Sequence, residues 1–120
     1  MGEFKVWVED DGVIRGKIIG EHTGEDARRI IRLIDDYIAK DKGKKCILID
    51  MRETGRPTAE SRKIHASNIK NGDTKFNKTA FFGAKIINRV MANFIIKASG
   101  KGKKVKYFDT ENDALKWLHE

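Results

Sequence analysis

The 120-residue sequence contains one cysteine, one proline and no long hydrophobic run. Cys46 has no second cysteine to pair with, which excludes an intrachain disulfide and a multi-cysteine metal site and favours a reducing compartment. The longest uninterrupted apolar stretch, residues 46–49, is far shorter than the roughly 20 residues of a membrane-spanning helix. The first residues mix acids and bases and lack the apolar run of a signal peptide. We therefore expect one cytoplasmic domain, residues 1–120, without a transmembrane segment.

Catalytic and cofactor motifs are also missing. The sequence contains no nucleophile elbow, Walker loop, paired-cysteine site or HExxH helix. The glycine- and lysine-rich run at residues 100–104 follows an expected helix instead of preceding one, so its amides cannot form a helix N-terminal phosphate site. His22, His65 and His119 lie on different expected elements, and we interpret them as surface residues. These absences predict a protein that is not an enzyme and carries no cofactor or metal.

Acidic residues are scarce in the second half of the chain. Residues 1–60 hold 12 Lys and Arg against 13 Asp and Glu, whereas residues 61–120 hold 13 against 5, so the second half carries the whole net charge of +7. Within residues 61–106 a single acid, Asp73, stands against 12 bases. The positive electrostatic field of such a segment attracts anionic partners, and nucleic-acid binding is therefore a hypothesis, although a weak one. The commoner interpretation is a solvated, solubilising face.

Hydrophobic periodicity predicts an α/β domain with the element order ββαβαβαβα. Alternating residues on either side of the turn Asp10-Asp11-Gly12 indicate an opening hairpin of residues 4–9 and 13–19. Thr23 caps the helix that follows, and Gly100 ends a later one. The other expected elements are strands at 45–51, 79–83 and 105–109, helices at 59–71 and 85–99, and a short helix after residue 110. Strands that alternate with helices after a hairpin predict a mixed sheet with parallel later strands and with 45–51 in its centre.

The loop expected at residues 52–57 is the best candidate site, because ligands of such sheets bind at the carboxyl ends of parallel strands. The residues with suitable chemistry are Asp50, Arg52, Thr54, Arg56, Thr58 and Ser61. Arginines beside hydroxyls and a helix N-terminus suit a phosphate group. Thr58 and Ser61 are also candidate phosphorylation sites, since a phosphate would add about −1.5 to −2 charge where a helix start favours it. The alternative is an ordinary loop in which Thr58 only caps the next helix.

The expected helix at 85–99 has an apolar face wider than one sheet contact requires. At about 100° per residue, its apolar side chains cover an arc of about 180°. Ile96 falls outside that arc, among Arg89 and Lys97, so we expect it to be exposed. A wide apolar stripe flanked by bases is typical of a dimer interface or a membrane-surface helix. We expect most of the apolar arc to pack in the core; its residues are Ile86, Ile87, Val90, Met91, Phe94, Ile95 and Ala98. We assign Ile96, Arg89 and Lys97 to an interface with a second copy or with a membrane.

Two segments, residues 44–52 and 105–118, carry a resemblance. The first reads KKCILIDMR and the second VKYFDTENDALKWL, and the closing Phe-Asp-Thr-Glu-x-x-Ala-Leu-x-Trp-Leu run is the more specific. Together they resemble the SpoIIAA-like family, a branch of the STAS domains named for sulfate transporters and anti-sigma-factor antagonists. The resemblance implies a small cytoplasmic α/β domain with a four- or five-stranded sheet, no catalytic activity, and binding of a protein or a small ligand.

The resemblance also implies a phosphoswitch. Antagonists of this kind have a serine at the start of the helix after the central strand, and its phosphorylation by a partner kinase breaks the complex. The Asp-Ser-Ser-Gly run of that switch does not occur here, and the matching stretch is residues 54–61, TGRPTAES. The family further resembles the lipid-binding SEC14 fold, which implies a hydrophobic ligand as an alternative.

Three function hypotheses follow. The first is a non-enzymatic STAS-like regulatory or ligand-binding module that acts through a protein partner or a small ligand. The second is SEC14-like binding of a lipid, or of another hydrophobic or anionic ligand, at a membrane surface. The third and weakest is nucleic-acid binding through the basic second half.

Overall fold

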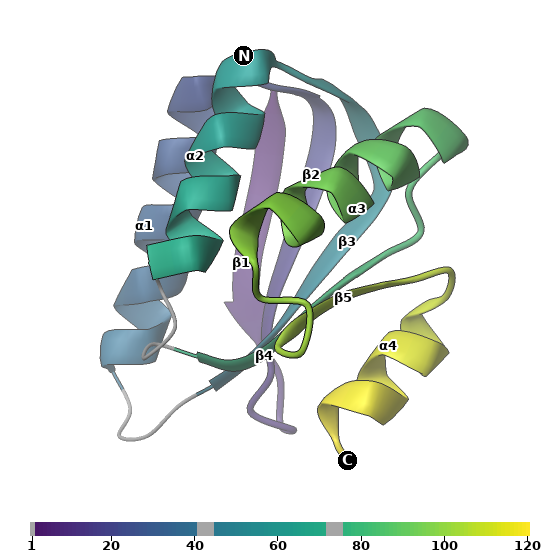
Figure 1. Ribbon diagram of the computed structural model, residues 1–120. Helices are drawn as coiled ribbons and strands as arrows, with labels where there is room; N and C mark the ends of the chain where they lie inside the picture. The colour runs from purple at the N-terminus through teal and green to yellow at the C-terminus, as the bar shows by residue number, and fades with distance from the viewer. Residues whose placement is uncertain (1, 41–44, 72–75) are drawn as a thin grey trace.

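The computed structural model describes residues 2–40, 45–71 and 76–120. Within these residues the chain forms one five-stranded sheet and four helices (Figure 1). In chain order the elements are β1 (Glu3–Val8), β2 (Ile14–His22), α1 (Gly24–Ala39), β3 (Lys45–Pro57), α2 (Ala59–Asn71), β4 (Phe76–Phe82), α3 (Ile86–Ser99), β5 (Val105–Phe108) and α4 (Glu111–Leu118). The predicted fold class and element order are confirmed.

The strands lie in the order β1-β2-β3-β4-β5, so β3 is central, as predicted. β1 is antiparallel to β2, and the other neighbours are parallel. The opening hairpin turns at Gly12, whose φ of 77° is the left-handed conformation that glycine adopts without strain. Its backbone N–H donates to the Glu9 carbonyl at 2.9 Å, and pairing begins at Val8 and Ile14.

β3 is longer than the sequence predicts, and this corrects the expected loop at residues 52–57. The apolar run at 47–49 is buried, as expected of a strand covered on both faces. Beyond it the strand continues through polar residues, because β2 is itself long and pairs Ile19 with Glu53 and Gly20 with Thr54. β4 stops pairing at Asp50, so only one neighbour holds this extension. Backbone pairing rather than an apolar pattern therefore extends β3, and hydrophobic periodicity cannot detect it.

The helices begin with the predicted caps. At α1 the Thr23 hydroxyl accepts from the Asp26 N–H, and the Asp26 carboxylate accepts from the Thr23 N–H, which satisfies two N-terminal donors. At α2 the Thr58 hydroxyl accepts from the Ser61 N–H at 3.1 Å. α2 buries only Ser61 and Ile69, which matches its weak apolar pattern, and it packs between α1 and α3. No helix in the described ranges is long and apolar enough to cross a membrane.

The orientation of α3 overturns one prediction. Ile96, which we expected to be exposed, is only 8% exposed and packs in the core beside Ala92. The apolar side chains that we expected to face the sheet instead point to solvent; they are Ile86, Ile87, Val90 and Phe94. The reason is a polar anchor that a hydrophobic wheel ignores: Asn88 is buried and bonds to the end of β3. Gly100, at φ 73°, ends the helix as predicted.

The two faces of the sheet carry separate cores. α1, α2 and α3 cover one face, where the core is built on Ile30, Ile47, Ile49 and their neighbours. α4 covers part of the other face and packs Ala114 and Leu118 on a second core. In Figure 1 the two sets of helices lie on opposite sides of the strands. Side chains that alternate along β3 therefore point into different environments.

Candidate functional site

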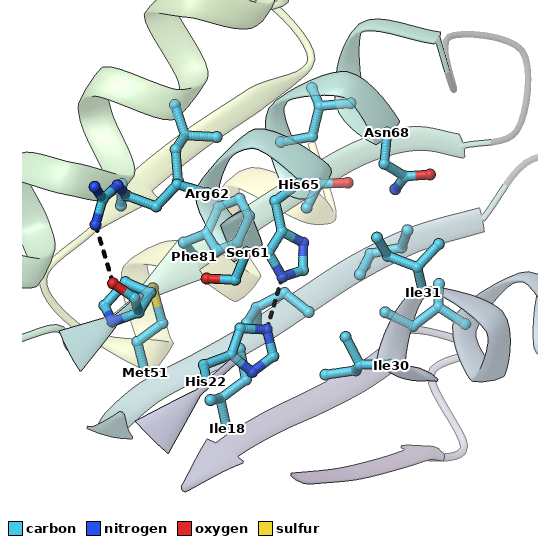
Figure 2. Close-up of a pocket in the computed structure, with 18 of the residues that line it drawn as sticks. Ile18, His22, Ile30, Ile31, Met51, Ser61, Arg62, His65, Asn68 and Phe81 are labelled. Atoms are coloured by element: carbon cyan, nitrogen blue, oxygen red, sulfur yellow. Dashed lines mark hydrogen bonds between the residues drawn. The ribbon is translucent and has the colours of Figure 1, made fainter. Parts of the chain in front are cut away.

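A cavity of about 100 Å³ lies between α1, α2, α3 and the sheet (Figure 2). Its walls are mostly aliphatic, aromatic or thioether side chains. The apolar lining comprises Ile18, Ile30, Ile31, Ile34, Ile38, Ile47, Ile49, Met51, Pro57, Ile69, Phe76, Phe81, Met91, Ala92 and Ile95. The wall on α1 follows from the helical spacing of its isoleucines, and the wall on β3 from the alternation of a strand. A wall of this kind favours apolar ligand atoms over water.

Two histidines meet at this cavity. His22 ends β2 and His65 lies on α2; their Nε2 atoms are 2.8 Å apart, so one ring donates a hydrogen bond and the other accepts it. The rings stack, with centroids 5.0 Å apart. Burial lowers the pKa of His22, although the Asp26 carboxylate opposes that shift. Burial and the neighbouring His22 lower the pKa of His65 to about 3. Both rings are therefore neutral near pH 7, and one Nε2 carries the proton that the other accepts.

Asn88 supplies the second polar group of the lining. Its Nδ2 donates to the backbone carbonyls of Thr54 and Gly55, both at 3.0 Å, which ties α3 to the end of β3. These two bonds also fix the orientation of the amide. Its Oδ1 is fully buried and has no hydrogen-bond partner among the described residues. An unpaired buried acceptor is costly, and Asn88 is one of the residues that line the cavity.

The hydroxyls predicted for the site are already engaged. Ser61 is completely buried and donates from Oγ to the Thr58 carbonyl at 2.8 Å, and Thr54 Oγ1 donates to the Ile18 carbonyl at 3.1 Å. Both residues line the cavity. In this conformation a kinase cannot reach Ser61, whereas Thr58 is half-buried. Phosphorylation of either residue stays a prediction.

The charged residues predicted for the site lie elsewhere. Arg52 donates from Nε and Nη2 to the Asp50 carboxylate, at 2.8 Å for the shortest bond. Burial raises the pKa of Asp50, but the hydrogen bonds from Arg52 outweigh it and lower that pKa. This pair lines a depression with Trp7 and Phe82 on the face that α4 covers in part. Arg56 is exposed. The structure thus splits the predicted cluster: Thr54 and Ser61 join the cavity, and Asp50 and Arg52 do not.

The basic residues are likewise divided. Lys78 and Lys106 both lie over the Trp117 ring on the α4 side, while Lys85 and Lys97 lie at α3 and are exposed. Arg89, one of the predicted interface residues, faces Asp109, with Nη1 3.7 Å from its carboxylate. No three His, Cys, Asp or Glu side chains gather to hold a metal ion in the part of the chain that the structure describes.

Sequence reasoning found Thr54 and Ser61 but missed the two histidines and Asn88 of the cavity. We interpreted the histidines as surface residues, but His22 is only 2% exposed and contacts His65 across 43 positions of sequence. No spacing rule connects two such distant residues. Asn88 left one signal: it is a polar residue within the apolar stretch that opens α3.

Comparison with known proteins identifies the family to which the chain belongs. A family model described as SpoIIAA-like matches residues 13–119. An uncharacterized protein from Shewanella loihica PV-4, of the DUF3478 family with a SpoIIAA-like fold, is similar with a TM-score of 0.73 and 22% identity over 98% of this chain and 95% of that chain. No curated protein matches.

Two regulators share the architecture. The anti-sigma factor antagonist SpoIIAA in its unphosphorylated form is similar with a TM-score of 0.70 and 12% identity over 98% of both chains. A putative anti-sigma factor antagonist from Thermotoga maritima is similar with a TM-score of 0.70 and 15% identity over 98% of this chain and 95% of that chain. At such identities the likeness is one of fold.

Proposed function

We propose that this chain, which belongs to the SpoIIAA-like family, is a non-enzymatic regulatory module that binds a small apolar ligand in the cavity beneath α1, α2 and α3. The observation that carries the proposal is the buried Asn88 Oδ1, an acceptor without a partner among the described residues, on a residue that lines a mostly apolar cavity. A ligand that donates one hydrogen bond would satisfy this atom and fill the apolar space. The similarity in fold to anti-sigma factor antagonists supports a regulatory role.

The size and chemistry of the cavity limit the ligand. About 100 Å³ is somewhat less than the roughly 150 Å³ of an engineered apolar cavity that binds benzene. A single ring or a short branched chain therefore fits. One hydroxyl or N–H is needed for Asn88. The walls are mostly apolar and both histidines are neutral, which disfavours a charged ligand group except beside Arg62 and Asp35, the two charged residues of the lining.

The state of the polar groups supports binding rather than catalysis. Nucleophilic catalysis needs a hydroxyl or thiol held by a general base. Here the Ser61 hydroxyl is occupied by a backbone carbonyl, and the two imidazoles are occupied by each other. These groups hold the walls of the cavity in place.

Phenol and benzene make a direct test, because they differ by the one hydroxyl that Asn88 would accept. In an NMR titration of the full chain we expect both to shift resonances of residues that line the cavity. Phenol should bind about two- to tenfold more tightly, the range expected for one hydrogen bond. Equal affinities would remove the role of Asn88, and no saturable shift with either probe would refute the cavity as a ligand site.

A pair of variants on the same helix supplies the control. Ala92 lines the cavity and Ala98 is exposed. Ala92→Phe places a ring where the probe would lie and should abolish phenol binding, whereas Ala98→Phe should leave it unchanged. If Ala92→Phe does not fold, the ratio of phenol to benzene affinity in the unmodified protein still decides.

A further inference from the structure

The outward face of α3 is the largest run of exposed apolar side chains among the described residues. Ile86, Ile87, Val90 and Phe94 are 75%, 56%, 64% and 69% exposed. The other exposed large hydrophobic residues, Val8 and Leu33, are isolated and only 41% and 42% exposed. Single exposed apolar residues are common, but a contiguous strip marks a surface that binds something.

This strip cannot turn inward, because the opposite face of α3 is held in place. Asn88 bonds to two carbonyls of β3, and Ala92 and Ile96 are buried in the core one and two turns later. Rotating the helix to bury Val90 and Phe94 would break both bonds and expose Ile96. The exposed strip is therefore a fixed property of the fold.

The charges on α3 itself are of one sign, and Asp109, an acid outside the helix, faces its Arg89. α3 contains no acidic residue, Lys85 precedes its first turn, and Lys97 stands in its last turn. Both lysines are exposed. A second copy packed on this helix would bring like charges together at the contact, which costs energy. A surface of anionic headgroups over an apolar interior complements lysines and apolar side chains at once.

We propose that α3 binds the surface of anionic membranes, with the strip Ile86, Ile87, Val90 and Phe94 at the boundary between headgroups and acyl chains and Lys85 and Lys97 on the headgroups. In Figure 1 α3 crosses in front of the strands, and the four side chains of the strip are more than half exposed, so they can contact an interface without unfolding of the helix. Apolar burial and attraction to anionic lipid both contribute to the binding of such helices. This surface is separate from the cavity, which is lined by other residues of the same helix, among them Met91 and Ile95.

Vesicle flotation of the full chain tests the proposal. The two vesicles are phosphatidylcholine alone and equal parts of phosphatidylcholine and phosphatidylglycerol. We expect the protein to float with the anionic vesicles only and to be released as salt rises towards about 1 M, where charges are screened within a few ångströms. No flotation with either vesicle, or equal flotation with both, would overturn the proposal.

Matched variants locate the contact. Val90→Ser with Phe94→Ser should lower the vesicle partition coefficient about tenfold or more, and Lys85→Gln with Lys97→Gln by a similar factor. The controls are Val8→Ser with Leu33→Ser and Lys5→Gln with Lys116→Gln, exposed residues outside α3, and both should bind as the unmodified protein does. If the α3 variants float undiminished, the site is wrong.

Two measurements distinguish membrane binding from dimerisation and from ligand binding in the cavity. Light scattering without vesicles should show a monomer. If it shows a dimer, and if Val90→Ser with Phe94→Ser dissociates that dimer, then the partner of α3 is a second copy of the chain and the membrane proposal is wrong. Phenol binding by the same double variant should be unchanged. Loss of vesicle binding with intact phenol binding is therefore the expected result, and the two proposals can fail independently.

Discussion

The two faces of the sheet treat their polar groups differently. On the α4 face several of the charges that line a depression beside the core have partners: Arg52 bonds to Asp50, and Arg15 bonds to Asp11 outside the depression, both at 2.8 Å. On the other face the cavity is apolar, and one of its few polar atoms, Asn88 Oδ1, has no partner among the described residues. Charged groups that are already paired have little hydrogen-bonding capacity left for a ligand. An unpaired acceptor in apolar surroundings gains free energy when a ligand donates a hydrogen bond to it.

The amount of helix on each face does not decide how well its core is packed. α4 has 8 residues and buries Ala114 and Leu118, which are 0% and 5% exposed, against β3 and β4. α1, α2 and α3 have 16, 13 and 14 residues, yet they leave the cavity beneath them and an apolar strip outside. α2 presents few apolar side chains to fill the space, and Asn88 turns the best apolar face of α3 outward. The chain is therefore less completely packed at the cavity and at the outer face of α3, where we propose that it binds a ligand and a membrane.

The largest effect that we predict tests this difference with two residues of equal burial, one on each face. Leu118 of α4 packs in the core of its face and lines neither hollow, whereas Ile49 of β3 lines the cavity, and both are 5% exposed. Leu118→Ala should lower the free energy of unfolding by about 3 kcal/mol, within the range for such truncations. Ile49→Ala should lower it by about 2 kcal/mol, because part of the Ile49 surface already faces open space. Urea denaturation measures both, and equal losses would mean that the cavity is filled in solution.

The sequence predicted the architecture because the signals for it are local. The capping residues Thr23 and Thr58, the turn glycine Gly12 and the apolar run before Asp50 each act within a few residues. The orientation of α3 was not predictable in this way, since one amide bonding to carbonyls 33 and 34 positions away outweighs four apolar side chains. The cavity was missed for the same reason: its polar groups come from β2, α2 and α3 and meet only in three dimensions.

A second prediction concerns the pair His22 and His65, which belongs to the cavity face alone. Their pKa values are lowered by folding, so between pH 6.5 and the folded values the unfolded chain binds more protons and stability falls as the pH falls. We expect a loss of about 1 kcal/mol between about pH 7.5 and about pH 5, where most carboxylates are still ionised. Urea denaturation at the two pH values measures it.

A variant assigns that loss to the pair. His65→Gln keeps a hydrogen-bonding side chain on α2 but removes the lowered pKa, so its stability should depend on pH less steeply than that of the unmodified protein. An unchanged slope in His65→Gln would show that the histidine pair is protonated with little cost in the folded state.

The smallest effects are expected at the arginines that the sequence analysis assigned to the site. Arg52→Ala removes the bidentate partner of a buried carboxylate; because Arg52 is itself exposed and Lys17 also lies near Asp50, the cost should be about 0.5–1 kcal/mol. Arg56→Ala should change stability by less than about 0.5 kcal/mol, as for other exposed residues. Neither change touches the cavity, so phenol should bind both variants as it binds the unmodified protein. Titration with inorganic phosphate completes the comparison. We expect no saturable binding to the unmodified protein. If the unmodified protein binds phosphate and the double variant Arg52→Ala with Arg56→Ala does not, these arginines form an anion site, and the conclusion that only the cavity face binds a ligand is wrong.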